Sequence, residues 1–345
     1  MKLRLSEMNV EAPLVSVVMP VFNAEKTVVK AAKSILRQSY ENFELLIIDD
    51  GSTDQSISLV GKIKDRRIKI VKNTINRGVV AVLNDALEIA SGDIVARQDS
   101  DDESVARRLE KQVRILKDEP GLVAVGSALR IVDENDRKVG TWSYPASSVL
   151  SRWQVLFKTP LAHSVAMYRK GPVCEIGGYS DAYRHAEDYH LWSRLSEIGG
   201  LRSIEEPLLK YSIASGGVSR KNADEQREIH CRIAQENILK KTGLRFSMRE
   251  IKKLCFLSDD ANVSVDSADV REVVEALSKI FENFKEAEKF QGFEGSIARD
   301  CVNRVSSCIK RVQFGERLKL LSGMRVRQAE FRVGAMDIVR CIIGR

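Results

Sequence analysis

The first hundred residues alternate between short apolar runs and amphipathic stretches, and this alternation constrains the fold more than any other feature of the chain. The runs at 14–19 and 43–48 are rich in Val, Ile and Leu and have the length of a buried strand. Apolar residues at helical spacing follow each run after a short connection. Strands that alternate with helices favour a mainly parallel, doubly wound α/β sheet. We expect strands at 14–19, 43–48, 68–71 and 93–96, and helices at 25–37, 56–65 and 79–90.

The second half of the chain divides into two kinds of pattern. A helix at 106–117, strand-like segments at 122–131 and 164–168, and a helix that begins near Glu187 continue the α/β pattern. Beyond about residue 217 long amphipathic stretches with few β-branched runs take over. We therefore predict an α/β domain at 1–222 and an all-helical C-terminal module at 223–345.

The net charge of +7 is concentrated at the C-terminus. Residues 301–345 contain ten Lys and Arg against three Asp and Glu, so the remainder of the chain is neutral. The basic residues alternate with aliphatic ones and aromatic residues are scarce, which disfavours nucleic-acid binding. Three interpretations of the tail stay open: helices that pack on the rest of the protein, a contact with an anionic membrane surface, or an oligomer interface.

The apolar runs and the cysteines bear on the compartment. The runs fall well short of the ~20 residues that cross a bilayer, and residues 1–11 lack the apolar segment of a secretory signal. The six cysteines are scattered, without a CxxC pair or a histidine at ligand spacing, which indicates reduced thiols. We expect a cytoplasmic protein, with the basic tail as the segment that would reach the inner face of the cell membrane.

Acidic residues gather in the loops that follow predicted strands, at 49–54 and 99–102. In doubly wound sheets, ligands bind at this edge, outside the carboxyl ends of the strands. Carboxylates alone would repel a nucleotide diphosphate, whereas a divalent cation binds both. A pair such as Asp99 and Asp101 is a weak signal by itself, because acids also favour the first turn of a helix. We assign Asp102 to such a helix start.

Five motifs occur in an order and rough spacing that are highly specific. They are VSVVMPVFN at 15–23, LLIIDDGSTD at 45–54, NRGVVAVLN at 76–84, DSDD at 99–102 and AEDYHLW at 186–192. Together they closely resemble glycosyltransferase family 2, the inverting enzymes of the GT-A fold, over about residues 13–220. The resemblance implies a GT-A-type doubly wound mixed sheet, to which the helical module is appended.

The resemblance also implies a reaction. A hexosyl or hexosaminyl unit would pass, with inversion, from a UDP-linked nucleotide-sugar to an acceptor hydroxyl. The acceptor would be a saccharide or a lipid-linked saccharide in the synthesis of bacterial cell-surface polysaccharide or glycolipid. The implied metal is Mn²⁺ or Mg²⁺.

Specific residues match the motifs of the family. Asp188 would be the general base, with Glu187 beside it, because inversion in one step needs one carboxylate to take the proton of the acceptor hydroxyl. Asp101 would coordinate the metal, Asp99 would face the ribose or sugar, and Asp50 would hydrogen-bond the base. The nucleotide pocket would be lined by Pro20, Phe22, Asn23, Glu25 and Arg77.

Other positions allow more than one interpretation. Arg97 and Gln98 replace the small or apolar residues usual in the family, so we expect a more polar approach to the metal. His163 would touch the acceptor or the diphosphate, or it would be a structural histidine. Ser219 and Arg220 lie in a basic, glycine-rich stretch that suits either a lid over the diphosphate or a linker.

Two other functions compete with sugar transfer. The first is a nucleotide-sugar-binding scaffold without turnover, although Asp101 and Asp188 are both present. The second is a nucleotidyltransferase, which would need a glycine-rich, basic phosphate loop after the first strand. Residues 20–24 contain neither glycine nor a basic residue.

Overall fold

The structure is a computed structural model that describes residues 12–213, 223–257, 265–288 and 293–312. It forms two compact units. The α/β unit comprises Met1–Arg152 and Thr159–Ile229, and the helical unit comprises Trp153–Lys158 and His230–Arg345. The units thus change over inside helix α9 (Ala223–Thr242). A division into functional domains at residue 222 stays a prediction.

A single nine-stranded sheet forms the centre of the α/β unit, and its first half is parallel. β1 pairs with β2 on one side and β4 on the other, and β3 lies beyond β2. Helices cover both sides of β1, β2 and β4, which explains why these strands read as continuous apolar runs. The four strands are β1 (Val15–Val21), β2 (Phe43–Asp49), β3 (Ile68–Lys72) and β4 (Ile94–Arg97).

The second half of the sheet is mixed, as predicted. Beyond β4 the order is β8, β6, β9, β5, and β7 pairs with a further part of β6. β6 and β9 are parallel to each other, whereas β5, β7 and β8 run antiparallel to their partners. The strands are β5 (Glu103–Ser104), β6 (Leu122–Val132), β7 (Lys138–Trp142), β8 (Met167–Arg169) and β9 (Gly200–Ser212).

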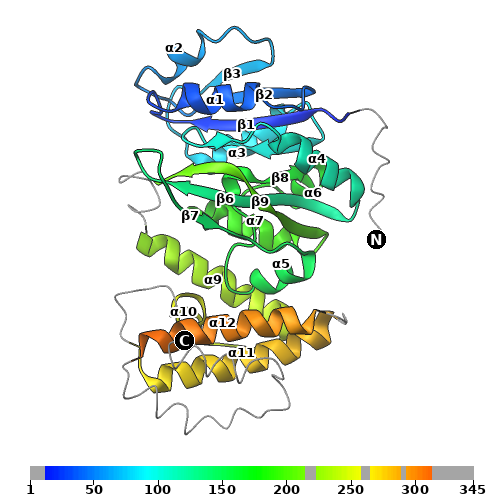
Figure 1. Ribbon diagram of the computed structural model, residues 1–345, viewed down its shortest axis with the longest axis vertical. Helices are drawn as coiled ribbons and strands as arrows, with labels where there is room; N and C mark the ends of the chain where they lie inside the picture. Colours follow the sequence, from blue (N-terminus) through cyan, green and yellow to red (C-terminus); the bar gives the residue numbers. More distant parts are fainter. Residues whose placement is uncertain (1–11, 214–222, 258–264, 289–292, 313–345) are drawn as a thin grey trace. The chain divides into compact units, whose positions relative to one another are not determined.

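Helices cover the two faces of the sheet (Figure 1). One apolar core joins β1 and β2 to α1, α2 and α4, and a second joins the opposite face to α3, α6 and α7. Trp192 of α7 is fully buried in the second core. The helices are α1 (Val28–Leu36), α2 (Ser56–Val60), α3 (Val79–Ile89), α4 (Arg108–Asp118), α5 (Ser148–Gln154), α6 (Lys170–Glu175) and α7 (Glu187–Leu195), with single 3₁₀ turns at η1 (His163–Val165) and η2 (Asp181–Tyr183).

Every regular element among the described residues of the C-terminal module is a helix. Trp153 anchors its core: the indole ring meets Phe157 and Phe284 edge-on, and its N–H donates to Asp300 Oδ2 at 2.8 Å. A capping box of Ser247 and Glu250 starts α10. The remaining helices are α10 (Met248–Phe256), α11 (Ser267–Glu288) and α12 (Glu294–Arg311). The basic tail beyond residue 312 lies outside the described residues.

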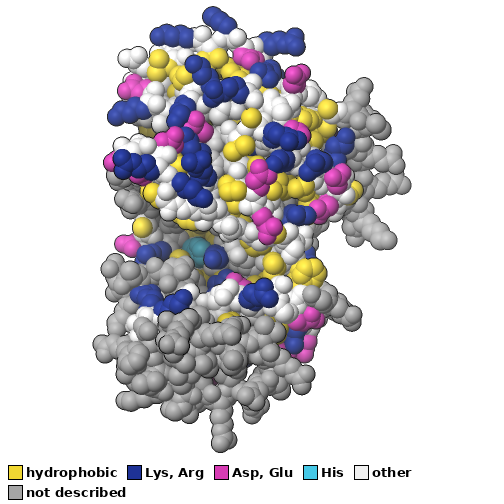
Figure 2. Space-filling view, viewed as in Figure 1, with side chains coloured by type: hydrophobic (Ala, Val, Ile, Leu, Met, Phe, Trp, Pro, Cys, Tyr) yellow, Lys and Arg dark blue, Asp and Glu magenta, His cyan; other side chains and the backbone are white. Residues whose placement is uncertain are grey.

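The surface over α1 and α4 carries Lys and Arg interspersed with Asp and Glu (Figure 2). Several of these charges are paired, as in Lys30–Glu103 at 2.8 Å and Arg107–Glu110 at 2.6 Å. Among the described residues, no helix is both long and apolar enough to span a membrane. The five described cysteines are free thiols, and four of them are buried.

Candidate active site

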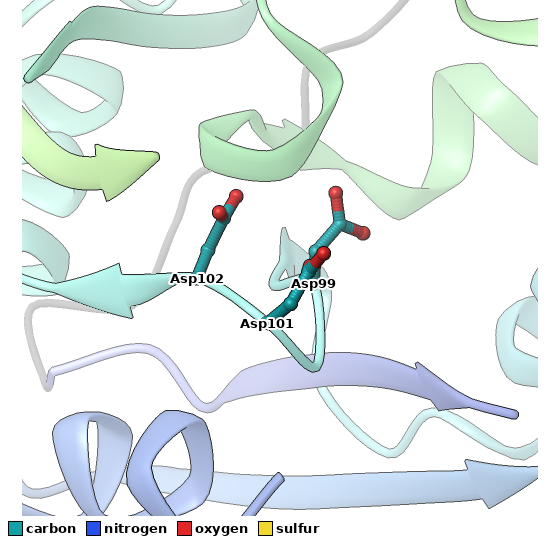
Figure 3. A group of neighbouring side chains, drawn as sticks. All are labelled: Asp99, Asp101 and Asp102. Carbon is teal, nitrogen blue, oxygen red and sulfur yellow. The ribbon is translucent and has the colours of Figure 1, made fainter. Parts of the chain in front are cut away.

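Three aspartates stand close together on the loop that leaves β4. The side chains of Asp99, Asp101 and Asp102 project from the same side of this loop (Figure 3). One carboxylate oxygen from each lies within 4.8 Å of the other two. We call this group the acidic cluster. It lies at the carboxyl end of a parallel strand, where the sequence placed it.

A buried amide holds the loop of the acidic cluster from beneath. Gln98, fully buried, donates through Nε2 to the backbone carbonyls of Asp99 at 3.0 Å and Asp102 at 2.9 Å. Its Oε1 accepts from the Ser104 hydroxyl at 2.6 Å and from Arg108 at 3.0 Å. The side-chain amide therefore fixes both ends of the loop, and its own hydrogen-bonding groups are satisfied.

Two buried arginines flank this amide. Arg97 forms an ion pair with Asp99 Oδ1 at 2.6 Å, and Arg108 donates to the backbone carbonyl of Arg97 at 2.5 Å. Burial lowers the pKa of Arg108 to about 9, although the nearby Asp102 opposes that shift. Arg97 and Gln98 therefore place buried polar groups next to the acidic cluster.

The assignment of Asp102 to a helix start is wrong. Helix α4 begins only at Arg108, and Asp102 is buried where β5 begins, next to the end of β9. Its Oδ1 accepts from the backbone N–H of Ser212 at 3.3 Å, and its Oδ2 makes no hydrogen bond of ordinary geometry among the described residues, although the nearby Ser164 hydroxyl favours the charged carboxylate. Burial, with Asp99 and Asp101 adding to it, raises the pKa of Asp102 well above its usual range.

The surroundings of the acidic cluster suit a divalent cation. Burial by the surrounding protein and the charge of Asp99 raise the pKa of Asp101, although its side chain reaches solvent. A hard cation such as Mn²⁺ or Mg²⁺ stabilises carboxylates that lie this close together, because its charge offsets their mutual repulsion. Asp101 and Asp102 have oxygens available to such an ion, and Asp99 keeps one oxygen beside the one that Arg97 holds.

The loops of the predicted nucleotide pocket are joined by side chain-to-backbone hydrogen bonds. Asn23 has φ of 49°, and its Oδ1 accepts from the Thr53 N–H at 2.9 Å. Glu25 accepts from the Gln55 N–H at 3.1 Å. Phe22 is half exposed above this junction, next to the partly buried Pro20. Asn23 and Glu25 thus shape the pocket by fixing residues 53–55.

Asp50 organises the opposite wall of this pocket. Its carboxylate accepts from the backbone N–H groups of Arg77 at 2.8 Å and Gly78 at 2.9 Å. Gly51 allows the close approach of this loop, since it has φ of 76° and a Cβ there would lie 2.7 Å from Ile75. The Arg77 guanidinium is paired with Asp85 of α3. A contact of Asp50 with the base stays a prediction.

Glu187 and Asp188 occupy the first turn of α7, as predicted. Burial raises the pKa of Asp188 to about 7, with the charges of Glu187 and Asp99 adding to the shift. The Asp188 carboxylate also accepts from the Tyr189 N–H at 2.7 Å. Burial raises the pKa of Glu187 too, and its Oε2 has no partner within the described part of the chain. A carboxyl with a pKa near neutrality is suited to proton transfer.

His163 lies close to the site and is neutral. Its Nε2 is 3.0 Å from the Tyr179 hydroxyl, and burial together with Arg97 lowers its pKa well below the usual range. A neutral, hydrogen-bonded ring favours the structural interpretation of the two that the sequence left open. Ser219 and Arg220 lie outside the described residues.

Sequence reasoning missed several residues around the site. Arg108 is buried on α4, one residue before Leu109, which begins the apolar series Leu109, Val113 and Leu116; that helical spacing offered a signal of burial. Tyr144 and Tyr211 also lie near the acids, since Asp188 contributes to the raised pKa of Tyr144 and the acidic cluster to that of Tyr211. No local pattern marked either tyrosine.

Comparison with known proteins agrees with this geometry. The family model "Glycosyl transferase family 2" matches residues 16–177. An uncharacterized glycosyltransferase of Haemophilus influenzae is 33% identical over 249 residues, 67% of this chain and 76% of that protein. The Escherichia coli UDP-Glc:alpha-D-GlcNAc-diphosphoundecaprenol beta-1,3-glucosyltransferase WfaP is 30% identical over 240 residues, 69% of this chain and 90% of that protein.

A solved structure shares the fold. The crystal structure of S. aureus TarS 1–349 in complex with UDP-GlcNAc superposes with a TM-score of 0.53 at 18% identity, over 95% of this chain and 90% of that one. The fold is of the GT-A type. The chain belongs to glycosyltransferase family 2 and is a glycosyltransferase.

The first prediction concerns Arg97. Replacing it by Met removes the buried counter-charge of Asp99, so Arg97→Met should lower the free energy of unfolding by about 2 kcal/mol, less than a fully buried pair because Asp99 is partly exposed. Urea unfolding of the full chain measures this. The control Arg107→Met removes an exposed pair with Glu110 and should leave stability unchanged. Equal stability of Arg97→Met and wild type would contradict the role of Arg97.

The second prediction concerns pH. A base with a pKa of about 7 is protonated, and inactive, below that value and becomes available as the pH rises. The kcat/KM for sugar transfer should therefore rise about tenfold per pH unit below 7 and level off above it. A profile that stays flat from about pH 6 to pH 8 would remove Asp188 from this role. Asp181→Asn, at an exposed acid, is the matched control and should keep the wild-type profile.

Proposed function

We propose that the chain is an inverting glycosyltransferase that moves a hexosyl or hexosaminyl unit from a UDP-sugar to an acceptor hydroxyl. One observation carries the proposal: Asp188, with a pKa of about 7, lies within electrostatic reach of Asp99 in the acidic cluster. A base and a diphosphate-binding group thus serve one reaction centre. The names of WfaP and of the TarS complex, with UDP-Glc and UDP-GlcNAc, support a UDP-linked donor.

Different residues act on the acceptor and on the donor. Asp188 takes the proton of the acceptor hydroxyl, whose oxygen attacks the anomeric carbon opposite the diphosphate. The bond between the anomeric carbon and the diphosphate oxygen breaks, and the nucleoside diphosphate leaves. Asp101 and Asp102 would hold Mn²⁺ or Mg²⁺, and Asp99 would face the ribose or sugar. Such an ion stabilises negative charge on the leaving diphosphate.

The donor pocket lies between the loops already described. Phe22, with Pro20 behind it, offers an apolar surface to the base, and Asp50 and the backbone of Arg77 form the facing wall. Because Asn23 and Glu25 fix the neighbouring loop, the pocket is arranged before the nucleotide binds.

The acceptor we propose is a saccharide, carried on a lipid in cell-surface polysaccharide or glycolipid synthesis. The name of WfaP, which acts on GlcNAc-diphosphoundecaprenol, supports this class. A lipid-linked acceptor lies at a membrane, and a basic tail at 301–345 would be attracted to an anionic surface there.

The third prediction tests turnover directly. Incubation of the full chain with a panel of UDP-sugars and Mn²⁺ should release UDP with one donor above the others. Asp188→Asn should reduce this release by at least about a hundredfold, because a general base contributes that much, while UDP binding stays within about twofold. Asp181→Asn is again the matched control. The absence of UDP release with every donor would favour the scaffold without turnover.

A further inference from the structure

Trp142 is an exposed tryptophan on an edge strand next to the active site. The chain has three tryptophans; Trp153 and Trp192 are buried, whereas Trp142 is 48% exposed. Its ring lies against that of Tyr211, with centroids 5.4 Å apart and planes at 40°. The two residues come from strands on opposite sides of β6, so their rings reach across that strand.

The strand register places apolar side chains of β6 on the same face of the sheet as these rings. Leu129 of β6 lies opposite Trp142, and Ile131 lies opposite Gly140 on β7 and Tyr211 on β9. Residues directly opposite in a sheet project from the same face. Among the residues that the structure describes, a Cβ added at Gly140 would meet no atom within 4 Å, so no described residue fills the space next to Gly140.

The surface formed by Trp142 and Tyr211 borders the acidic cluster and Asp188. Tyr211 is followed by Ser212, whose N–H donates to Asp102 Oδ1 at 3.3 Å. Burial and then the three carboxylates of the acidic cluster raise the pKa of Tyr211 to about 12. Tyr144 packs against the same apolar cluster as Tyr211, and the charge of Asp188 adds to the effect of burial on its raised pKa.

We propose that Trp142, Tyr211 and the space beside Gly140 form the acceptor subsite and bind the sugar ring of the acceptor. The inference rests on the proposed function, because it assigns the acceptor side of the same reaction centre. A pyranose has an apolar face of C–H groups and a polar rim of hydroxyls. The aromatic rings would bind the C–H face, and the Tyr211 hydroxyl and the Trp142 N–H would hydrogen-bond the hydroxyls of the rim. The donor pocket lies on other loops, at residues 20–25 and 50–56.

Fluorescence reports binding without turnover. Because Trp142 is the exposed tryptophan of the three, acrylamide should quench it selectively. Methyl and octyl glycosides of Glc and GlcNAc serve as probes, and at least one sugar should protect Trp142 equally in both forms. Protection by octyl glycosides alone would show that the alkyl chain binds, and absence of protection would show that no sugar binds there. Either result overturns the subsite.

Variants connect the subsite to transfer. Trp142→Ala removes an aromatic contact, and Gly140→Leu fills the space where the sugar would bind. Each should raise KM for the protecting glycoside about tenfold, while KM for the UDP-sugar stays unchanged. Gly140→Leu fills open space on a strand, so it should fold as wild type does. Thr141→Ala, on the opposite face of β7, is the matched control.

Hydrolysis of the UDP-sugar by water separates the two proposals. It needs the donor pocket but no acceptor, so the wild-type chain should hydrolyse its donor whether or not a sugar binds beside Trp142. Transfer with an unchanged acceptor KM in Trp142→Ala would overturn the subsite alone. Protection of Trp142 in a chain without UDP release would contradict the proposed function and would leave a sugar-binding site that is not an acceptor subsite.

Discussion

The buried bracing of the loop after β4 is the constraint on which the site depends. Three carboxylates whose oxygens gather within 4.8 Å repel one another, and an unsupported loop would open to separate them. Gln98 prevents this by binding the backbone at both ends of the loop, and Arg97 neutralises Asp99 from the buried side. The fold thus keeps the three carboxylates close together, an arrangement that a bound divalent cation would stabilise.

The same edge of the sheet presents two different surfaces on either side of this loop. On the donor side, loops are joined through Asn23, Glu25 and Asp50 to backbone N–H groups, which gives a rigid polar wall. On the other side, the ends of β7 and β9 present the rings of Trp142 and Tyr211. A charged nucleotide and a neutral sugar ring would need such different surroundings, and in the proposed reaction they would meet at the acidic cluster and Asp188.

Sequence alone predicted the parallel half of the sheet and the placement of the acidic cluster. Because β1, β2 and β4 are buried on both faces, their sequences are continuous apolar runs. The ends of these runs predict where the loops of the site begin. β9 was missed because Glu205, Glu206 and Pro207 interrupt its apolar pattern. The burial of Asp102 could not be predicted either, since it depends on β9 lying alongside β5, a contact between residues far apart in the chain.

The central claim is that the acidic cluster binds a divalent cation together with the nucleotide. Electron paramagnetic resonance of Mn²⁺ titrated into the full chain, with and without UDP, measures this binding directly. Wild type should bind a single Mn²⁺ more tightly when UDP is present, and Asp101→Asn should lose that site while Asp118→Asn, at an exposed acid of α4, keeps it. Equal Mn²⁺ binding by wild type and Asp101→Asn would contradict the account.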